Sequence, residues 1–114
     1  MARLVSDGKS VPVTLKAAVT KGDDIVGPAK TEDGFFGFPF EDGASGDTIN
    51  IDVSQREYEL EVPEAVTAAK GDTLYLDSST GAITDTSTDN TPFLKVTVAK
   101  DVNNIVHGIL LPQA

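Results

Sequence analysis

The chain has 114 residues, the length of one domain that buries roughly 65% of the surface of its unfolded chain. It contains no cysteine, which excludes a disulfide framework, a thiol nucleophile and a zinc–thiolate site. Its formal net charge of −9 argues against nucleic-acid binding through phosphates, because such binding needs a basic face.

The first 22 residues are basic, in contrast to the rest of the chain. They hold Arg3, Lys9, Lys16 and Lys21 against Asp7 alone, a net charge of +3, which leaves −12 for the remaining residues. The asymmetry is either chance in a short segment or the mark of an arm. Such an arm would reach an acidic partner surface or the body of a neighbouring subunit.

Short strand-like segments dominate the chain, and helix-period patterning is almost absent. We therefore predict a loosely ordered arm over residues 1–10 and a single β-rich domain over residues 11–114. Residues 63–71 are predicted to be a loop and residues 85–92 a polar linker. No apolar stretch is long enough to span a bilayer, so no membrane partner is expected. Strands are predicted at residues 11–15, 24–26, 35–38, 48–53, 57–62, 73–77, 82–84, 94–99 and 105–111.

A Gly-Asp pair followed by a strand-like run occurs three times, beginning at Gly22, Gly46 and Gly71. Glycine tolerates a positive φ and aspartate hydrogen-bonds within its own turn, so each pair predicts a tight turn that starts a strand. The even spacing predicts a small all-β fold, a β-barrel, β-tulip-like fold or sandwich built from short hairpins.

Glutamates alternate with apolar residues in residues 57–62, so the glutamates share one face and the apolar residues share the other. Three neighbouring carboxylates could collect a metal ion, but their mutual repulsion favours a solvated face. Residues 48–53 repeat the alternation. We predict that these two strands form a hairpin, with Arg56 in the turn between them.

Four of the five phenylalanines, Phe35, Phe36, Phe38 and Phe40, lie within six residues of one another. Pro39 removes a ladder donor and places this run at an edge or a strand end. Because the run follows neither a strand nor a helix period, its rings cannot all face one core. It either forms a subunit interface, where aromatic residues are enriched, or plugs the end of a barrel.

The sequence offers few combinations of residues that could form a catalytic site. His107 is the only histidine and lies in a predicted strand, which excludes a histidine dyad. Asp77, Asp85 and Asp89 with Asn90 supply oxygen ligands, but their spacing matches no calcium loop. We predict no catalytic, cofactor-binding or metal-binding residue.

Four segments occur in an order and spacing that resemble the small capsid decoration, or cement, proteins of tailed bacteriophages. They are Asp7-Gly8-Lys9-Ser10-Val11-Pro12-Val13-Thr14, Val19-Thr20-Lys21-Gly22-Asp23, Ala68-Ala69-Lys70-Gly71-Asp72-Thr73-Leu74-Tyr75-Leu76-Asp77 and Gly81-Ala82-Ile83-Thr84. The resemblance covers nearly the whole chain, and its specificity lies in the order and spacing of these segments.

The resemblance implies a non-enzymatic structural protein of the virion, made in the host cytoplasm. It would sit as a homotrimer on the outside of the expanded capsid, bridging neighbouring major capsid proteins, without cofactor and without direct contact to nucleic acid. On this basis we expect an arm that contacts the capsid and a phenylalanine run that contacts the capsid or the other subunits. The arm residues are Ala2, Arg3, Leu4, Val5 and Lys9, and the interface residues are Phe35, Phe36, Phe38 and Phe40.

The main alternative is a carrier or ligand-binding barrel, because Gly-Asp turns before strands also occur in biotinyl and lipoyl carrier domains. Those domains present a lysine at a hairpin tip. Here Lys95 and Lys100 lie in or beside a predicted strand, and the tip-like segments 79–81 and 86–88 contain no lysine. An enzyme ranks third, because acid–base groups occur only as scattered carboxylates.

Overall fold

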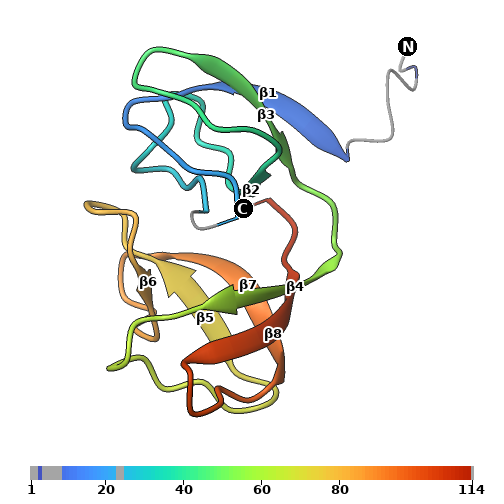
Figure 1. The fold of residues 1–114 in the computed structure, drawn as a ribbon, viewed down its shortest axis with the longest axis vertical. Coiled ribbons are helices and arrows are strands. Elements are labelled where there is room, and N and C mark those ends of the chain that lie inside the picture. Colours follow the sequence, from blue (N-terminus) through green and yellow to red (C-terminus); the bar gives the residue numbers. More distant parts are fainter. Residues whose placement is uncertain (1–2, 4–8, 23–24, 114) are drawn as a thin grey trace.

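The computed structural model describes residue 3, residues 9–22 and residues 25–113. Within these ranges the chain forms strands and no helix, which confirms the all-β prediction (Figure 1). No helix of the length and apolarity needed to cross a membrane occurs in this part of the chain. The strands are β1 (Ser10–Thr14), β2 (Phe38–Pro39), β3 (Thr48–Asp52), β4 (Glu57–Glu61), β5 (Thr73–Leu76), β6 (Ile83–Thr84), β7 (Thr91–Val98) and β8 (Ile105–Leu110).

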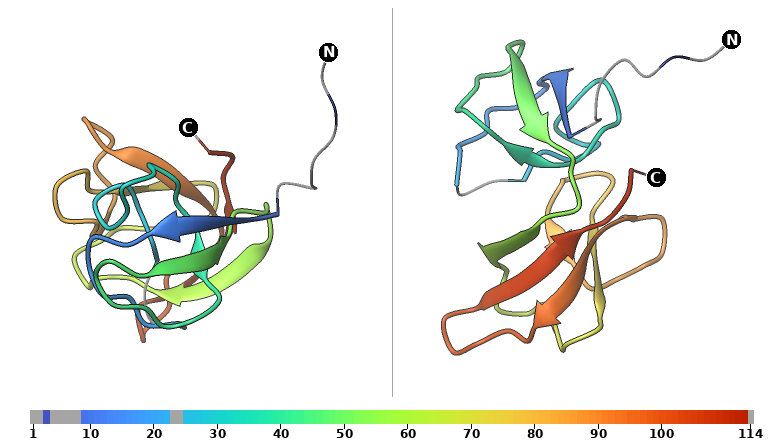
Figure 2. Two further views of the ribbon diagram at one scale, coloured as in Figure 1. Left: turned by 90° about the horizontal axis from the view of Figure 1, so that it is seen from above. Right: turned by 90° about the vertical axis from the view of Figure 1, so that its right-hand side faces the viewer.

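The strands form two antiparallel sheets, stacked one above the other in Figure 1. The smaller has the order β1-β3-β2 and the larger the order β4-β8-β7-β5-β6. We call the described part of residues 9–53 the N-terminal lobe and residues 57–111 the C-terminal lobe. The larger sheet curls on itself (Figure 2), so the C-terminal lobe is a half-closed barrel with β4 and β6 at its two edges.

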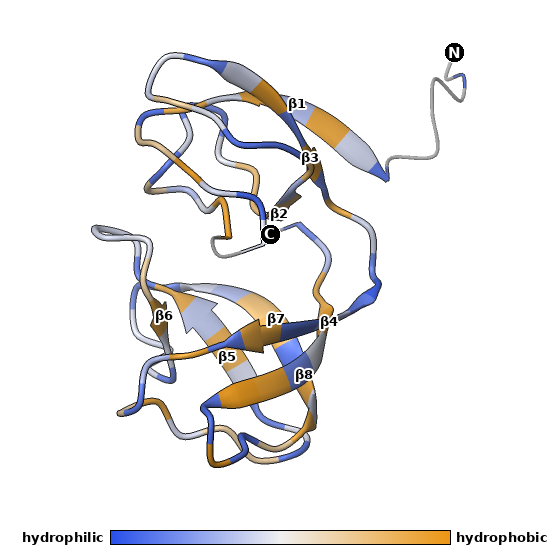
Figure 3. Cartoon of the chain, viewed as in Figure 1, coloured by the Kyte–Doolittle hydropathy of each residue, from blue (hydrophilic) through white to orange (hydrophobic). Residues whose placement is uncertain are grey.

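Each sheet covers a hydrophobic core of its own. Glutamates alternate with less polar residues along β4 (Figure 3), and every second residue of β8 is buried, so one face of the curled sheet is turned toward its core. The core of the N-terminal lobe consists of Val13, Leu15, Val19, Val26, Ile49 and Ile51. The core of the C-terminal lobe consists of Ile25, Phe36, Val62, Val66, Ala68, Leu74, Leu76, Phe93, Leu94, Val96, Val106 and Leu110.

Two residues of the N-terminal lobe, Ile25 and Phe36, pack into the core of the C-terminal lobe. The C-terminal segment makes the reverse connection and returns beside β2 (Figure 1). There the backbone N–H of Phe36 donates to Oε1 of Gln113 at 2.8 Å, and Nε2 of Gln113 donates to the carbonyl of Phe36 at 2.7 Å. The two lobes are therefore joined by packing and hydrogen bonds as well as by the chain.

The Gly-Asp turns form as predicted. Gly22, Gly46 and Gly71 have φ values of 89°, 92° and 93°, a region that favours glycine. Gly46 donates its N–H to the carbonyl of Leu15, directly after β1, and Gly71 to that of Val96 in β7, both at 2.8 Å.

The aspartates of two turns play the same local role. Oδ2 of Asp47 accepts the N–H of Ala44, and Oδ2 of Asp72 accepts the N–H of Ala69, both at 2.9 Å. Each carboxylate thus closes the turn three residues back, as short polar side chains commonly do. Asp23, the aspartate of the first pair, lies outside the described residues.

We expect Gly71→Ala to lower the free energy of unfolding by about 1–2 kcal/mol, because an L-residue is strained at this φ. No atom lies within 4 Å of the added Cβ, so the loss reports backbone strain alone. Urea unfolding followed by circular dichroism measures it. Lys70→Ala, in the same turn, is the control and should leave the midpoint unchanged; equal midpoints for both variants would contradict the strain argument.

The predicted hairpin of residues 48–53 with 57–62 is wrong. β3 pairs with β1 and β2, whereas β4 pairs with β8 in the other sheet. The connection between them is held by side chains rather than by a cross-strand ladder. The side chain of Asp52 accepts the N–H of Ser54 at 2.9 Å, and this local bond turns the chain from one sheet into the next.

Three other boundaries differ from prediction. The predicted strand at 24–26 is reduced to a single bridge between Val26 and Gly37, and the strand expected at 35–38 lies at Phe38–Pro39. β7 begins at Thr91, inside the predicted polar linker. Pro92 lies opposite Tyr75 of β5, beside a register shift, and precedes the register with β8, which starts at Leu94; bulges and strand ends are the positions where sheets tolerate proline. Residues 63–71 form no helix, as predicted.

Candidate interaction surface

The structure divides the phenylalanine run between the core and the surface. Phe36 is 1% exposed and belongs to the core of the C-terminal lobe. Phe35 and Phe40 are 37% and 45% exposed. Phe38 is half-buried and stacks on Tyr58 with ring centroids 3.8 Å apart. Phe36 is therefore a core residue, and of this run only the other three rings are accessible to a partner.

A groove of about 230 Å³ lies beside the exposed end of this run, between the two lobes. One wall comes from the N-terminal lobe and the other from β4. A second hollow of about 660 Å³ shares Gly22, Glu59 and Leu60 with it and extends the groove along β4 to Pro63 and Ile105. The residues that line the first hollow are Lys21, Gly22, Phe38, Pro39, Phe40, Tyr58, Glu59 and Leu60.

The glutamates of β4 form an exposed acidic face, as predicted. Oε2 of Glu57 accepts the hydroxyl of Thr97 at 2.6 Å, and Oε2 of Glu59 lies 3.6 Å from Nε2 of His107. His107 lies in β8, directly opposite Glu59, which confirms its prediction as a strand residue. The described part of the chain contains no cluster of three or more acidic, histidine or cysteine side chains arranged to hold a metal ion.

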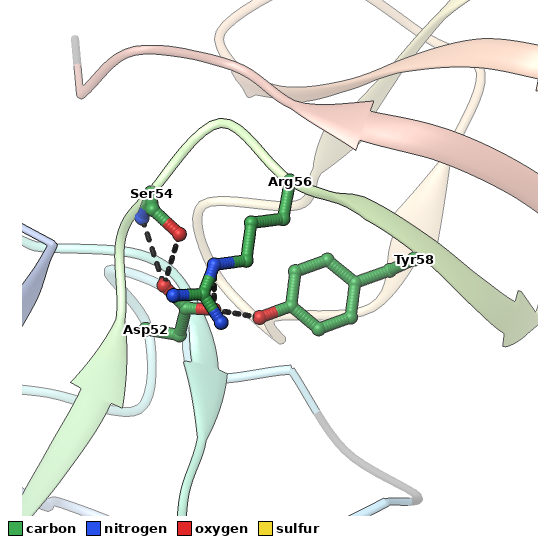
Figure 4. Close-up of polar contacts among 4 residues, drawn as sticks. All are labelled: Asp52, Ser54, Arg56 and Tyr58. Atoms are coloured by element: carbon green, nitrogen blue, oxygen red, sulfur yellow. Dashed lines mark hydrogen bonds and ion pairs between the residues drawn. The ribbon is translucent and has the colours of Figure 1, made fainter.

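Asp52 is a buried carboxylate that strand alternation did not predict. Its position in residues 48–53 suggests an outward side chain, yet it is 1% exposed. Figure 4 shows its partners: Ser54 donates through its N–H and hydroxyl, Tyr58 donates its hydroxyl, and Nε of Arg56 lies 3.9 Å away. The serine two residues after the aspartate is the local signal that could have revealed this turn.

This network changes the acidity of both of its ionisable partners. Burial raises the pKa of Asp52, but the hydrogen bonds from Ser54 and Tyr58 outweigh it, and the net effect is a lowered pKa. Burial and the bond to the Asp52 carboxylate raise the pKa of Tyr58 above its ordinary value. The tyrosine therefore stays a donor, and its ring is held in place as the wall of the groove.

A protein-family model described as phage cement protein matches residues 5–107. The chain belongs to the phage cement protein family. The resemblance drawn from the order of the Gly-Asp segments is thereby confirmed, and the cement protein has a capsid-associated structural role. No curated protein and no solved structure matches the chain.

The remaining sequence candidates of this cement protein serve structural purposes. Oδ1 of Asp77 accepts the N–H groups of Ser79 and Thr80, at 2.8 and 3.0 Å, and these backbone bonds lower the pKa of Asp77. Asp85 accepts the N–H of Thr67 at 2.8 Å. These carboxylates stabilise loops and do not converge on a cation.

The two lysines considered for a carrier role are also placed by the structure. Lys95 lies within β7. Lys100 donates its Nζ to the carbonyls of Glu64 and Val66, at 2.7 and 2.6 Å. Lys95 is therefore a strand residue, and Lys100, in the connection between β7 and β8, has its Nζ held by two backbone carbonyls.

Most of the predicted arm of the cement protein lies outside the described residues, including Ala2, Leu4 and Val5. Arg3 and Lys9 are described, and both are exposed. The carbonyl of Lys9 accepts the N–H of Val53 at 2.9 Å, so residue 9 lies beside the end of β3.

Proposed function

We propose that this cement protein binds the outer surface of the expanded phage capsid as a homotrimer and bridges neighbouring major capsid proteins. The observation that carries the proposal is the family match over residues 5–107. The protein acts by adhesion and not by catalysis. It is made in the host cytoplasm and assembles onto the virion without direct contact to DNA or membrane.

Trimerisation explains how a small surface can stabilise a shell. Once one subunit of a trimer is bound, the others meet their capsid sites at a high effective concentration, so individually modest contacts add up to strong attachment. Exposed aromatic rings are the residues best suited to the centre of such contacts. We assign this role to Phe38 and Phe40, which line the groove, and to Phe35, which is exposed.

The arm supplies a second contact in this proposal. Ala2, Arg3, Leu4, Val5 and Lys9 are assigned to the capsid surface because the first 22 residues carry a net charge of +3, while the remaining residues carry −12. A basic segment on an acidic body is suited to a partner surface of opposite charge.

Deleting residues 2–8 is expected to weaken capsid binding at least about tenfold while leaving the fold intact. The deletion spares Lys9 and its hydrogen bond to Val53. The measurement is co-sedimentation of the purified protein with expanded capsids of the phage that encodes it, with unexpanded capsids in parallel. Circular dichroism and the melting temperature serve as controls for folding.

The outcomes of this experiment are distinct. Saturable binding of the intact protein to expanded shells, near one copy per capsid protein, supports the proposed function, and no binding to either shell refutes it. Equal binding by the intact and the truncated protein refutes the role of the arm alone. Arg3→Glu, in the full-length chain, separates the charge of the arm from its length.

A further inference from the structure

β4 is an edge strand whose outer side has no partner strand in the described part of the chain. Two hydrogen bonds show which residues of this segment point their backbone groups toward β8. The N–H of Val62 donates to the carbonyl of Asn104 at 2.8 Å, and the N–H of Leu110 donates to the carbonyl of Arg56 at 3.1 Å. Bonded and non-bonded pairs alternate along an antiparallel ladder. The residues that bond β8 are therefore the even-numbered ones from 56 to 62.

The N–H and C=O groups of Glu57, Glu59 and Glu61 accordingly point away from β8. They form no backbone hydrogen bond with another described residue. Such a row of free groups is the template onto which an extended chain adds as a new strand. The free edge faces the groove, because Glu59, Leu60 and Glu61 line its hollows.

The two faces of β4 define the chemistry of such a strand. On one face, Tyr58 and Leu60 line the groove together with Phe38 and Pro39 and offer an apolar surface. On the other face, the three glutamates are exposed. Cross-strand neighbours of opposite charge stabilise a sheet and like charges opposite one another destabilise it. The edge therefore selects a segment that alternates apolar and basic residues.

We propose that the free edge of β4 accepts an extended segment of the major capsid protein as an added strand, with apolar side chains against Tyr58 and Leu60 and basic side chains against the glutamates. This inference rests on the proposed function, which supplies the capsid protein as partner. Pairing with the β4 of a second copy is disfavoured, because it would set the glutamates of both copies against one another.

Glu59→Pro tests the added strand. Proline removes the outward N–H of residue 59 and places its ring at the free edge, but it breaks no bond to β8. We expect binding to expanded capsids to weaken at least about tenfold with an unchanged melting temperature. Glu59→Ala is the matched control: it removes the same carboxylate, keeps the N–H, and is expected to bind more tightly than the proline variant.

Amide hydrogen exchange gives a second measurement that needs no substitution. The wild-type protein is labelled while bound to expanded capsids, dissociated under quench and compared with the free protein. We expect exchange at Glu57, Glu59 and Glu61 to slow at least about tenfold on binding, while Tyr58 and Leu60, which bond β8, are protected in both states.

The outcomes separate this inference from the proposed function. If the wild-type protein does not bind capsids, both are overturned. If it binds and the exchange of the three glutamate amides is unchanged, the added strand is overturned while the capsid-binding function stands. Equal binding of folded Glu59→Pro and Glu59→Ala also overturns it. If the proline variant does not fold, the exchange measurement decides.

Discussion

Phe36→Ala is expected to lower the free energy of unfolding by about 3–5 kcal/mol, the range for a large aromatic side chain removed from a packed core. Phe36 is 1% exposed and packs among the residues of the C-terminal core. Phe35→Ala, one residue away and 37% exposed, is expected to change stability by less than about 0.5 kcal/mol. Urea unfolding of the pair, followed by circular dichroism, measures both values.

The same pair of variants tests which phenylalanines form an interface with a partner and which pack inside the protein. Phe35→Ala is expected to weaken capsid co-sedimentation or trimerisation while keeping its stability, which is the signature of a contact residue. If Phe35→Ala were as destabilising as Phe36→Ala, the ring of Phe35 would belong to the core and not to an interface. If Phe36→Ala cost less than about 1 kcal/mol, the packing of this ring between the lobes would be contradicted.

Phe36 also bears on whether residues 11–114 behave as a single domain. Each lobe has a core of its own, but Ile25 and Phe36 of one lobe pack into the core of the other. We propose that the lobes unfold together, so that the calorimetric and van't Hoff enthalpies of the wild-type protein agree. Two resolved transitions would show separate domains.

The parts of the fold that could be predicted are those encoded by adjacent residues. The turns at Gly46 and Gly71 follow from a glycine that adopts positive φ and an aspartate that bonds within the same turn. The alternation in residues 57–62 predicted the exposed face of β4 because a strand has a period of two whatever its partner.

The parts that could not be predicted depend on which segments meet in space. The strands of residues 48–53 and 57–62 look like a hairpin because only three or four residues separate them, yet β4 pairs with β8, which lies far along the chain. Nothing in the local pattern distinguishes these pairings. The groove could not be predicted either, because it forms where the N-terminal lobe meets β4, and these segments are brought together only by the fold.

The phenylalanine run shows the limit for the site itself. The spacing of the phenylalanines predicted that their rings could not all face one core, and the structure buries Phe36 while leaving Phe35 and Phe40 exposed. The sequence could not show which of the rings is buried. The burial of Phe36 depends on the bridge between Val26 and Gly37 and on the hydrogen bonds between Gln113 and Phe36.

Asp52→Asn is expected to lower the free energy of unfolding at pH 7 by about 1.5–3 kcal/mol, the range for hydrogen bonds to a charged group. The amide keeps the shape of the side chain but replaces a carboxylate oxygen with a donor, which leaves Tyr58 or Ser54 without its acceptor. Urea unfolding at a series of pH values measures the loss. Glu64→Gln, which removes one exposed carboxylate, is the control and should change stability little.

The effect of Asp52→Asn should depend on pH with a definite sign. The pKa of Asp52 is lower in the folded protein than in the unfolded chain, where an aspartate titrates near about 3.9. Its contribution to stability is therefore complete above that value and is lost as the pH falls through the lower folded pKa. The stability difference between the wild-type protein and Asp52→Asn is thus expected to be constant near neutral pH and to shrink below about pH 4. A difference that grew on acidification would mean that burial outweighs the hydrogen bonds of Ser54 and Tyr58, and that the connection between the lobes is held by contacts other than this carboxylate.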